Sequence, residues 1–415
     1  MGRKGRFLAA IAGLALFASI AATAASGAHR ADPGVTSTTI HIGGTFPLTG
    51  VASLYKTIPA AEGAYFAYIN AHGGVNGRKI DFTVLDDAYD PSKTVPLTQQ
   101  LVEQDGIFAD FGSLGTAPNL SIWSYLNQHK VPQVLIATGD SYWGFSAKKY
   151  PWTMGYQPDY PGEGKVYGKY ISAHMPNAKI GVLYQNDAFG KNYFAGLRVG
   201  LGAKKSQIVS AQSYDPTQTS LVQQILALKA SGADAFAIFA LPSQAITALV
   251  TATKVGWTPT IFLGNVSANP IFLKIAAQNG ANVNGVISTN YLVDTTAASM
   301  ANLPGVTLAK SIISTYAPPL LPSLNGGDAN VVYGLGAAWT FVYALQHAGK
   351  NPTRAGLMKA LKSMNHVKDP FLYPGITLNT SAKDNFPTEQ EILDKWEGGA
   401  TGAYTYFGEL YNNVR

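Results

Sequence analysis

Short runs of β-branched and aliphatic residues alternate with longer amphipathic stretches along most of the chain. Residues 39–43 (TIHIG) and 80–85 (IDFTVL) predict strands, and residues 60–71 between them predict a helix closed by Gly73 and Gly74. A second helix is predicted to begin at Asp90 and Pro91, because Asp is a favoured N-cap and Pro a favoured first helical residue. Further strands are expected at residues 107–111, 133–137, 179–184, 207–212, 234–239, 260–263 and 284–289.

Strands that alternate with helices predict βαβ units and mainly parallel sheets covered on both faces. The alternation is interrupted at residues 150–162, near 289–291 before a helical block at 301–364, and at 370–374 before strand-like runs at 373–378 and 404–407. We therefore expect an α/β fold with two Rossmann-like lobes joined by a three-segment hinge. The first lobe is assigned residues 38–155 and 290–370, and the second lobe residues 156–289 and 371–415. A hinge beneath a cleft allows the lobes to close on a ligand at the carboxyl ends of the strands.

The first 25 residues have the order of a secretory signal peptide. Arg3, Lys4 and Arg6 precede an uncharged apolar run of about sixteen residues, and small residues follow it. A membrane anchor is the alternative, but a spanning helix needs roughly twenty apolar residues. Residues 26–37 are then interpreted as a polar, flexible leader.

Composition narrows the class of protein further. The chain has no cysteine, which excludes disulfides, thiolate metal sites and a lipidated cysteine, so we expect a free exported protein and favour a periplasm. Loss of Arg3, Lys4 and Arg6 with the signal peptide lowers the formal charge from +6 to about +3. With only 13% charged residues and no long Lys/Arg run, no nucleic-acid partner is expected.

The sequence motifs of common cofactor sites and nucleophiles are absent. There is no phosphate-binding loop, no GxGxxG fingerprint, no GxSxG elbow and no HExxH pair, so no cofactor and no metal is expected. Asp86, Asp87 and Asp90 suggest a cation site as one possibility, but a strand-end turn followed by a helix N-cap explains them better.

Three segments near the start resemble the leucine/isoleucine/valine-binding branch of the periplasmic binding proteins, which serve ABC importers. Residues 42–50 (IGGTFPLTG) are similar to the family's first strand and its S/T-G turn, residues 69–80 (INAHGGVNGRKI) to its INAxGGVNGRKI turn, and residues 86–91 (DDAYDP) to its DDxxDP motif. Weaker similarity continues through residues 112–116 and 184–190 to about residue 380. The resemblance implies a type I periplasmic binding protein fold that binds a small molecule between its lobes.

The resemblance also implies where the ligand binds. In the family, a hydroxyl side chain and backbone N–H groups after the third strand hold the ligand carboxylate, and the matching position here is Ser113. Amides at a helix N-terminus favour an anion on physical grounds as well. The expected contacts are Tyr55, Ser113, Leu114, Gly115, Thr116, Thr138, Gly139, Asp140, Trp143, Phe189, Asn265 and Tyr291.

One departure from the family concerns the other end of the ligand. Family members that bind amino acids place a second-lobe carboxylate on the ligand's ammonium group, whereas residues 262–267 (FLGNVS) contain no acid. A buried ammonium group without a countercharge is unfavourable by several kcal/mol. Either Asp140 supplies the charge, or the ligand is another organic acid, such as an aromatic one.

We therefore expect a non-enzymatic, monomeric solute-binding protein that delivers a carboxylate-bearing ligand to the permease subunits of an ABC importer. A ligand-sensing partner of a signalling receptor is the alternative, because the same fold serves receptors. A secreted enzyme is disfavoured, because neither Ser113 nor Ser141 has a histidine placed by a catalytic motif.

Overall fold

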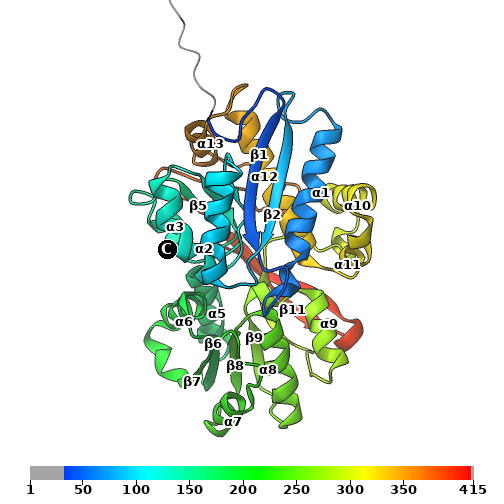
Figure 1. Cartoon of the computed structure of the whole chain (residues 1–415). Coiled ribbons are helices and arrows are strands. Elements are labelled where there is room, and N and C mark those ends of the chain that lie inside the picture. Colours follow the sequence, from blue (N-terminus) through cyan, green and yellow to red (C-terminus); the bar gives the residue numbers. More distant parts are fainter. Residues whose placement is uncertain (1–31, 413–415) are drawn as a thin grey trace, which may run out of the picture. The chain divides into compact units, whose positions relative to one another are not determined.

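The strands form two separate sheets. In the computed structural model, which describes residues 32–412, a five-stranded sheet has the order β2-β1-β3-β4-β5 and a seven-stranded sheet the order β12-β11-β10-β9-β8-β6-β7. The first sheet comprises β1 (Thr39–Phe46), β2 (Lys79–Asp86), β3 (Asp110–Phe111), β4 (Gln133–Ile136) and β5 (Thr153–Gly155). The second comprises β6 (Ile180–Gln185), β7 (Ile208–Tyr214), β8 (Ala235–Phe239), β9 (Thr260–Leu263), β10 (Ile287–Asn290), β11 (Gln390–Glu397) and β12 (Ala403–Asn412). Figure 1 shows β1 and β2 in blue and β6 to β9 in green.

Helices connect the strands and cover the sheets. They are α1 (Thr57–Ala71), α2 (Pro91–Gln99), α3 (Thr116–Gln128), α4 (Tyr142–Phe145), α5 (Tyr160–His174), α6 (Ala188–Leu201), α7 (Val222–Ala230), α8 (Pro242–Lys254), α9 (Pro270–Gln278), α10 (Pro304–Tyr316), α11 (Leu321–Asn325), α12 (Ala329–His347) and α13 (Arg354–Leu361). Helix α2 begins as predicted, because the Asp90 side chain accepts a hydrogen bond from the amide of Ser92 and Pro91 is the first helical residue.

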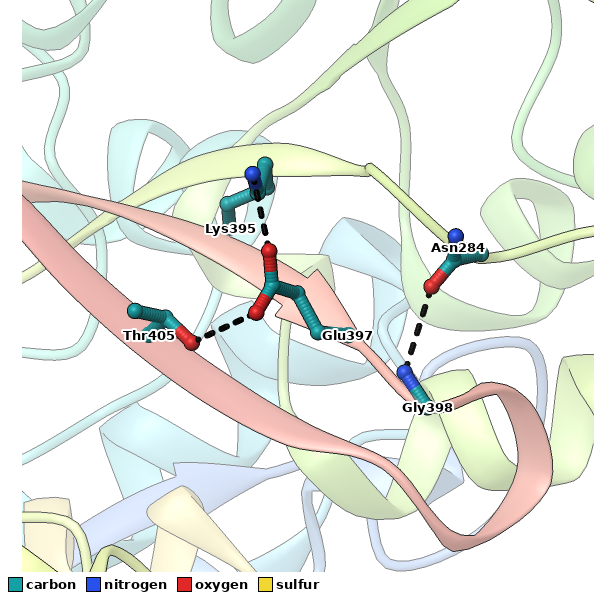
Figure 2. Close-up of polar contacts among 5 residues, drawn as sticks. All are labelled: Asn284, Lys395, Glu397, Gly398 and Thr405. Carbon is teal, nitrogen blue, oxygen red and sulfur yellow. Dashed lines mark hydrogen bonds and ion pairs between the residues drawn. The ribbon is translucent and has the colours of Figure 1, made fainter.

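The first sheet is parallel throughout, and the second is parallel up to its C-terminal hairpin. Strand β11 pairs antiparallel with β10, and β12 pairs antiparallel with β11. The hairpin is held at its turn by the contacts in Figure 2, where Glu397 forms an ion pair with Lys395 at 2.8 Å and accepts a hydrogen bond from the Thr405 hydroxyl. The amide of Gly398 also donates to the Asn284 side chain, so the turn is tied to the segment that precedes β10.

Each sheet has its own apolar core, and we call each sheet with its covering helices a lobe. Alternate residues of β8 show the arrangement in the second lobe, because Phe236 and Ile238 pack into one cluster and Ala237 and Phe239 into another on the opposite face. Buried residues of α10 to α13 belong to the core of the first lobe, although they follow β10 of the second. The chain therefore passes between the lobes after β5, after β10 and before β11, as a three-segment hinge requires.

Most predicted elements are present, with three differences. Residues 373–378 form no strand, because the Tyr373 amide donates to the Tyr291 carbonyl and Ile376 closes a turn. The predicted crossover at 150–162 contains the short strand β5, and the long strand β11 was not expected. The division into residues 38–155 with 290–370 and 156–289 with 371–415 stays a prediction.

Two segments near the N-terminus need separate mention. The expected signal peptide, residues 1–25, and residues 26–31 of the expected leader lie outside the described residues. Residues 32–37 contact the first lobe, where the Asp32 carboxylate accepts a hydrogen bond of 2.6 Å from the Arg354 amide. From residue 32 to residue 412, no helix has both the length and the apolarity needed to cross a membrane.

Candidate functional site

A cavity lies where the carboxyl ends of strands from both sheets meet. Its wall includes Leu114 after β3, Ala137 after β4, Leu241 after β8, Asn265 after β9 and Tyr291 after β10. The space free of protein atoms between these residues is about 960 Å³, open solvent at the mouth included. The position agrees with the expectation that ligands bind outside the carboxyl ends of parallel strands.

Aromatic side chains dominate the wall. Phe189 and seven tyrosines line it: Tyr55, Tyr89, Tyr160, Tyr291, Tyr333, Tyr404 and Tyr406. The Tyr55 hydroxyl donates to the Val266 carbonyl at 3.0 Å, which links the first lobe to the second. No Lys, Arg or His belongs to this wall, all of which lies in the described part of the chain. A ligand in the cavity is thus recognised by aromatic surface, hydroxyl groups, amides and acids.

The N-terminus of α3 forms one polar part of the wall. Gly115 precedes the helix with φ +104°, and no side chain caps the amides of the first turn. The Thr116 and Thr138 hydroxyls are 2.6 Å apart, so one donates to the other. A Cβ atom at Gly115 would lie 2.5 Å from Cε2 of Tyr89, so a larger residue cannot present these amides in the same way. Uncapped amides at the positive end of a helix dipole favour an anion, such as a carboxylate.

Ser113 is fully buried and does not line the cavity. Its hydroxyl donates to Oδ1 of Asp110 at 2.6 Å and accepts a hydrogen bond from the Thr45 amide at 3.0 Å. Burial raises the pKa of Asp110 to about 7, an effect that the Ser113 hydrogen bond opposes. The hydroxyl is therefore engaged inside the first lobe, and its expected contact with a carboxylate stays a prediction.

The expected contacts after β4 also lie outside the cavity wall. The Asp140 carboxylate accepts hydrogen bonds from the Tyr142 amide at 2.9 Å and from Nδ2 of Asn192 at 2.8 Å. Burial raises the pKa of Asp140 to about 6, although both hydrogen bonds lower it. The Gly139 carbonyl accepts from the Tyr160 amide. The geometry gives Asp140 a role between the lobes, where Asn192 of α6 reaches it, and does not place it on a ligand ammonium group.

Trp143 packs in a small apolar cluster. Its ring meets Trp123 edge-on, with centroids 5.4 Å apart, and Phe386 belongs to the same cluster. Seven of the twelve expected contacts do line the cavity: Tyr55, Leu114, Gly115, Thr116, Phe189, Asn265 and Tyr291. Ser113, Thr138, Gly139, Asp140 and Trp143 do not.

Asn265 lines the cavity, and both of its nitrogen atoms donate hydrogen bonds within the protein. Its amide donates to Glu163 at 2.7 Å, and its side-chain nitrogen donates to the Thr289 carbonyl. Burial raises the pKa of Glu163, while hydrogen bonds from Tyr167 and Tyr193 lower it. The second lobe thus uses a buried carboxyl group to hold this loop against the cavity.

Two acids in the wall were not predicted from the sequence. Asp294 accepts hydrogen bonds from the Thr296 amide at 2.7 Å and from the Tyr406 hydroxyl at 3.0 Å. Asp394 lies on β11 and is 2% exposed. A sequence signal for Asp394 existed, because it lies two residues from each of the buried residues Ile392 and Trp396, which is the spacing of side chains on one face of a strand.

The acidic segment after β2 is a turn. Burial raises the pKa of Asp86, but hydrogen bonds from the Thr49 hydroxyl and from the amides of Ala88, Thr49 and Leu48 lower it by more. Within residues 32–412, no three His, Asp or Glu side chains are grouped as ligands of a metal ion.

Comparison with known proteins identifies the family of this chain. The profile of the family described as periplasmic binding protein matches residues 39–400. The chain belongs to this family. Among curated relatives, the Leu/Ile/Val-binding protein homolog 3 of Brucella melitensis biotype 1 is 23% identical over 362 residues, which cover 87% of this chain and 92% of the relative.

Solved structures of periplasmic binding proteins share the fold. A fatty acid ABC transporter substrate-binding protein from Thermomonospora curvata superposes with a TM-score of 0.78 at 24% identity, covering 92% of this chain and 95% of the other. A branched-chain amino acid ABC transporter protein from Thermus thermophilus with bound valine has a TM-score of 0.77 at 18% identity, covering 91% and 97%. The expected type I fold is therefore confirmed.

Proposed function

We propose that the protein is an exported solute-binding protein that holds a small carboxylate-bearing ligand in this cavity and delivers it to the permease subunits of an ABC importer. The observation that carries the proposal is the cavity at the carboxyl ends of both sheets, with the uncapped N-terminus of α3 in its wall. The first turn of α3 and the Thr116 hydroxyl are the donors for the carboxylate. Since no basic side chain among residues 32–412 lines the cavity, the carboxylate is held by hydrogen bonds and the helix dipole.

The relatives support a carboxylate without fixing the rest of the ligand. The similar structures described above are associated with fatty acid and with valine, and both compounds carry a carboxylate. The tyrosine-rich wall suits an apolar or partly aromatic body between the polar ends.

Delivery to an importer requires a protein that reaches the ligand outside the cytoplasm. The basic and apolar order of residues 1–25 supports export, and the lack of cysteine supports a free protein in the periplasm. We propose that the protein acts as a monomer and releases its ligand chemically unchanged.

Calorimetric titration of the purified protein tests the carboxylate. Carboxylic acids that raise the melting temperature are compared with their methyl esters, and we expect the acids to bind at least tenfold more tightly. Thr116→Val keeps the shape and removes one donor to a charged acceptor, so it should weaken the acid by about 10-fold to 100-fold, or roughly 1.5–3 kcal/mol. Thr98→Val is the matched control, because Thr98 is buried in α2 and its hydroxyl has no partner. Equal binding of acid and ester, or chemical conversion of a bound acid, contradicts the proposal.

A further inference from the structure

We propose that a basic groove on the second lobe binds an acidic segment of a partner protein, in extended conformation, beside the edge strand β7. The groove, which we call the α6 groove, has aromatic, aliphatic and basic side chains in its wall, among them Tyr184, Lys191, Phe194, Arg198, Val199 and Lys205. No residue of its wall belongs to the wall of the ligand cavity. The inference therefore concerns a second site and goes beyond the proposed function.

The α6 groove follows the face of α6 that is turned away from the core. Its wall residues on this helix recur at intervals of three and four, which places them on one side of the helix. Tyr193 and Leu197 belong to the other side and are fully buried in the core of the second lobe. Val199 is 64% exposed although it is apolar, and Lys191 and Arg198 are exposed as well. In the described part of the chain, nothing covers this face.

The surface around the α6 groove is strongly basic. The wall contains three cations, Lys191, Arg198 and Lys205, and no acid. Residues 164–214, which include α6 and β7, contain seven Lys and Arg residues and a single acid, Asp187. Asp187 is engaged at the start of α6, where it accepts hydrogen bonds from the Gly190 amide and from the Gln185 side chain. Such an excess of positive charge favours an acidic partner.

The protein does not neutralise the cations of the α6 groove. Within residues 32–412 the ion pair that forms joins Lys395 to Glu397, and no hydrogen bond engages the side chains of Lys191, Arg198 and Lys205. Arg198 lies over the Phe194 ring, 5.9 Å from its centroid. A guanidinium that stacks on a ring still presents its N–H groups at its edge, where a carboxylate binds.

The free edge of the second sheet lies next to the α6 groove. Strand β7 pairs with β6 on one side, and no described strand pairs with its other side (Figure 1). Tyr184 of β6 contacts the Phe194 ring, with centroids 5.2 Å apart, and pairs with Ser213 of β7. Paired residues share one face of a sheet, so Ser213 lies on the face that α6 covers. Val209, Ala211 and Ser213 are exposed, so α6 does not extend over the edge.

The strand edge and the cations together select the class of partner. A free edge offers backbone N–H and C=O groups to an added strand, and β7 has seven residues with no proline and no charge among them. A strand of that length extends over about 23 Å. The path from Lys191 to Lys205 is similar, about 20 Å at the helical rise per residue. An acidic peptide strand therefore reaches both features, whereas an anionic membrane offers no strand to pair with β7.

Binding of synthetic octapeptides tests the proposal. In the three probes Val alternates with Glu, with Ser or with Lys, both ends are capped, and affinity is measured by fluorescence anisotropy at about 50 mM NaCl. We expect the Glu peptide to bind at least tenfold more tightly than the Ser peptide, and the Lys peptide to bind more weakly still. Arg198→Glu combined with Lys205→Glu should weaken the Glu peptide at least tenfold. Lys254→Glu combined with Lys359→Glu is the control, because it makes the same change of net charge on exposed residues of α8 and α13.

Amide hydrogen exchange separates strand addition from simple attraction of charges. Saturation with the Glu peptide should slow exchange in residues 208–214 at least threefold, because backbone groups of β7 become hydrogen-bonded to the peptide. Exchange in α8, which packs in the other apolar cluster of the second lobe, should stay unchanged. A peptide held by charge alone would leave the exchange of β7 unchanged.

Several outcomes would overturn the proposal. It is refuted if the three peptides bind alike, if the groove variant and the control variant lose the same affinity, or if the Glu peptide binds without slowing exchange in β7. Attachment to phosphatidylglycerol vesicles through Arg198 and Lys205, with no peptide bound, would assign the groove to a membrane instead. Should the groove variant not fold, Lys191→Gln combined with Lys205→Gln takes its place, with a loss of at least fivefold expected. Ligand titrations of the same variants should be unchanged, so failure of this proposal leaves the proposed function standing.

Discussion

Replacement of Asp110 by Asn should change how stability depends on pH. Asp110 is fully buried at the start of β3, where its Oδ1 atom accepts a hydrogen bond from the Ser113 hydroxyl and its Oδ2 atom has no partner. Burial raises its pKa from 3.8 to about 7, and the nearby Asp87 carboxylate adds to the shift. Because the folded protein holds this proton more tightly than the unfolded chain, the wild type loses stability as the pH rises from below 4 through 7.

The size of the effect follows from the shift. About three pKa units at 1.36 kcal/mol each give about 4 kcal/mol, nearly all of which falls between pH 4 and pH 8. Asp110→Asn does not titrate, so its free energy of unfolding relative to the wild type should rise by about 4 kcal/mol over that range. At pH 4 the variant should be less stable by about 1–3 kcal/mol, because its amide leaves a buried donor without a partner.

Urea unfolding of both proteins at several pH values measures this difference, and the other titrating groups cancel. Asp90→Asn is a control of opposite sign, because hydrogen bonds from Ser92 lower the pKa of Asp90 at the start of α2. The Asp90 carboxylate stabilises the folded state as the pH rises through its lowered pKa. The free energy of unfolding of Asp90→Asn relative to the wild type should therefore fall as the pH rises. A difference between Asp110→Asn and the wild type that stays within about 1 kcal/mol from pH 4 to pH 8 would refute the reasoning.

Three further substitutions test the geometry of the site. Gly115→Ala should weaken ligand binding at least tenfold in calorimetric titration, because the new Cβ would lie 2.5 Å from the Tyr89 ring in the cavity wall. Gly73→Ala is the control, because Gly73 also has a positive φ, +95°, but has open space around it. This control should show only the cost of backbone strain, about 1 kcal/mol in urea unfolding. Trp143→Ala should lower the free energy of unfolding by about 3–5 kcal/mol and leave the ligand affinity of the folded protein unchanged, since this ring packs in a core cluster. Asn192→Ala removes the hydrogen bond to Asp140 between the lobes, so stopped-flow measurements should show ligand dissociation accelerated several-fold and association changed less than about twofold.

Each of these results has a counterpart that contradicts it. Equal binding losses in Gly115→Ala and Gly73→Ala would mean that strain alone matters. A loss of ligand affinity in folded Trp143→Ala would show that the Trp143 side chain contributes to ligand binding. Unchanged dissociation in Asn192→Ala would show that its hydrogen bond does not hold the lobes together.

Much of the fold could be predicted from local sequence patterns. The alternation of strands and helices predicted two α/β lobes, and the Asp90 cap appeared at its predicted position, because both depend on neighbouring residues. Strand β11 escaped prediction because the acids Glu391 and Asp394 interrupt its apolar pattern, although both are buried. Residues 373–378 have strand-like composition, but their backbone bonds to Tyr291 and closes a turn.

The residues that line the cavity were harder to predict than the fold, because the direction of a polar side chain depends on its hydrogen-bond partner. Ser113 follows β3 as expected, but Asp110 lies three residues earlier and takes its hydroxyl. Asp140 likewise meets Asn192, which is 52 residues away in the chain. Asp394 reaches the cavity only because β11 returns to the second sheet after α13. A pairing over such a distance in the chain, as between Asp140 and Asn192, leaves no local pattern in a single sequence.

The late return of the chain has a consequence for biosynthesis. Asp394, Tyr404 and Tyr406 line the cavity and belong to the last two described strands. The ribosome therefore makes this part of the cavity wall after every other described element. Domains generally begin to fold from the N-terminus as they emerge. Nascent chains that already contain the first lobe and most of the second therefore lack this part of the cavity wall until the final hairpin is made.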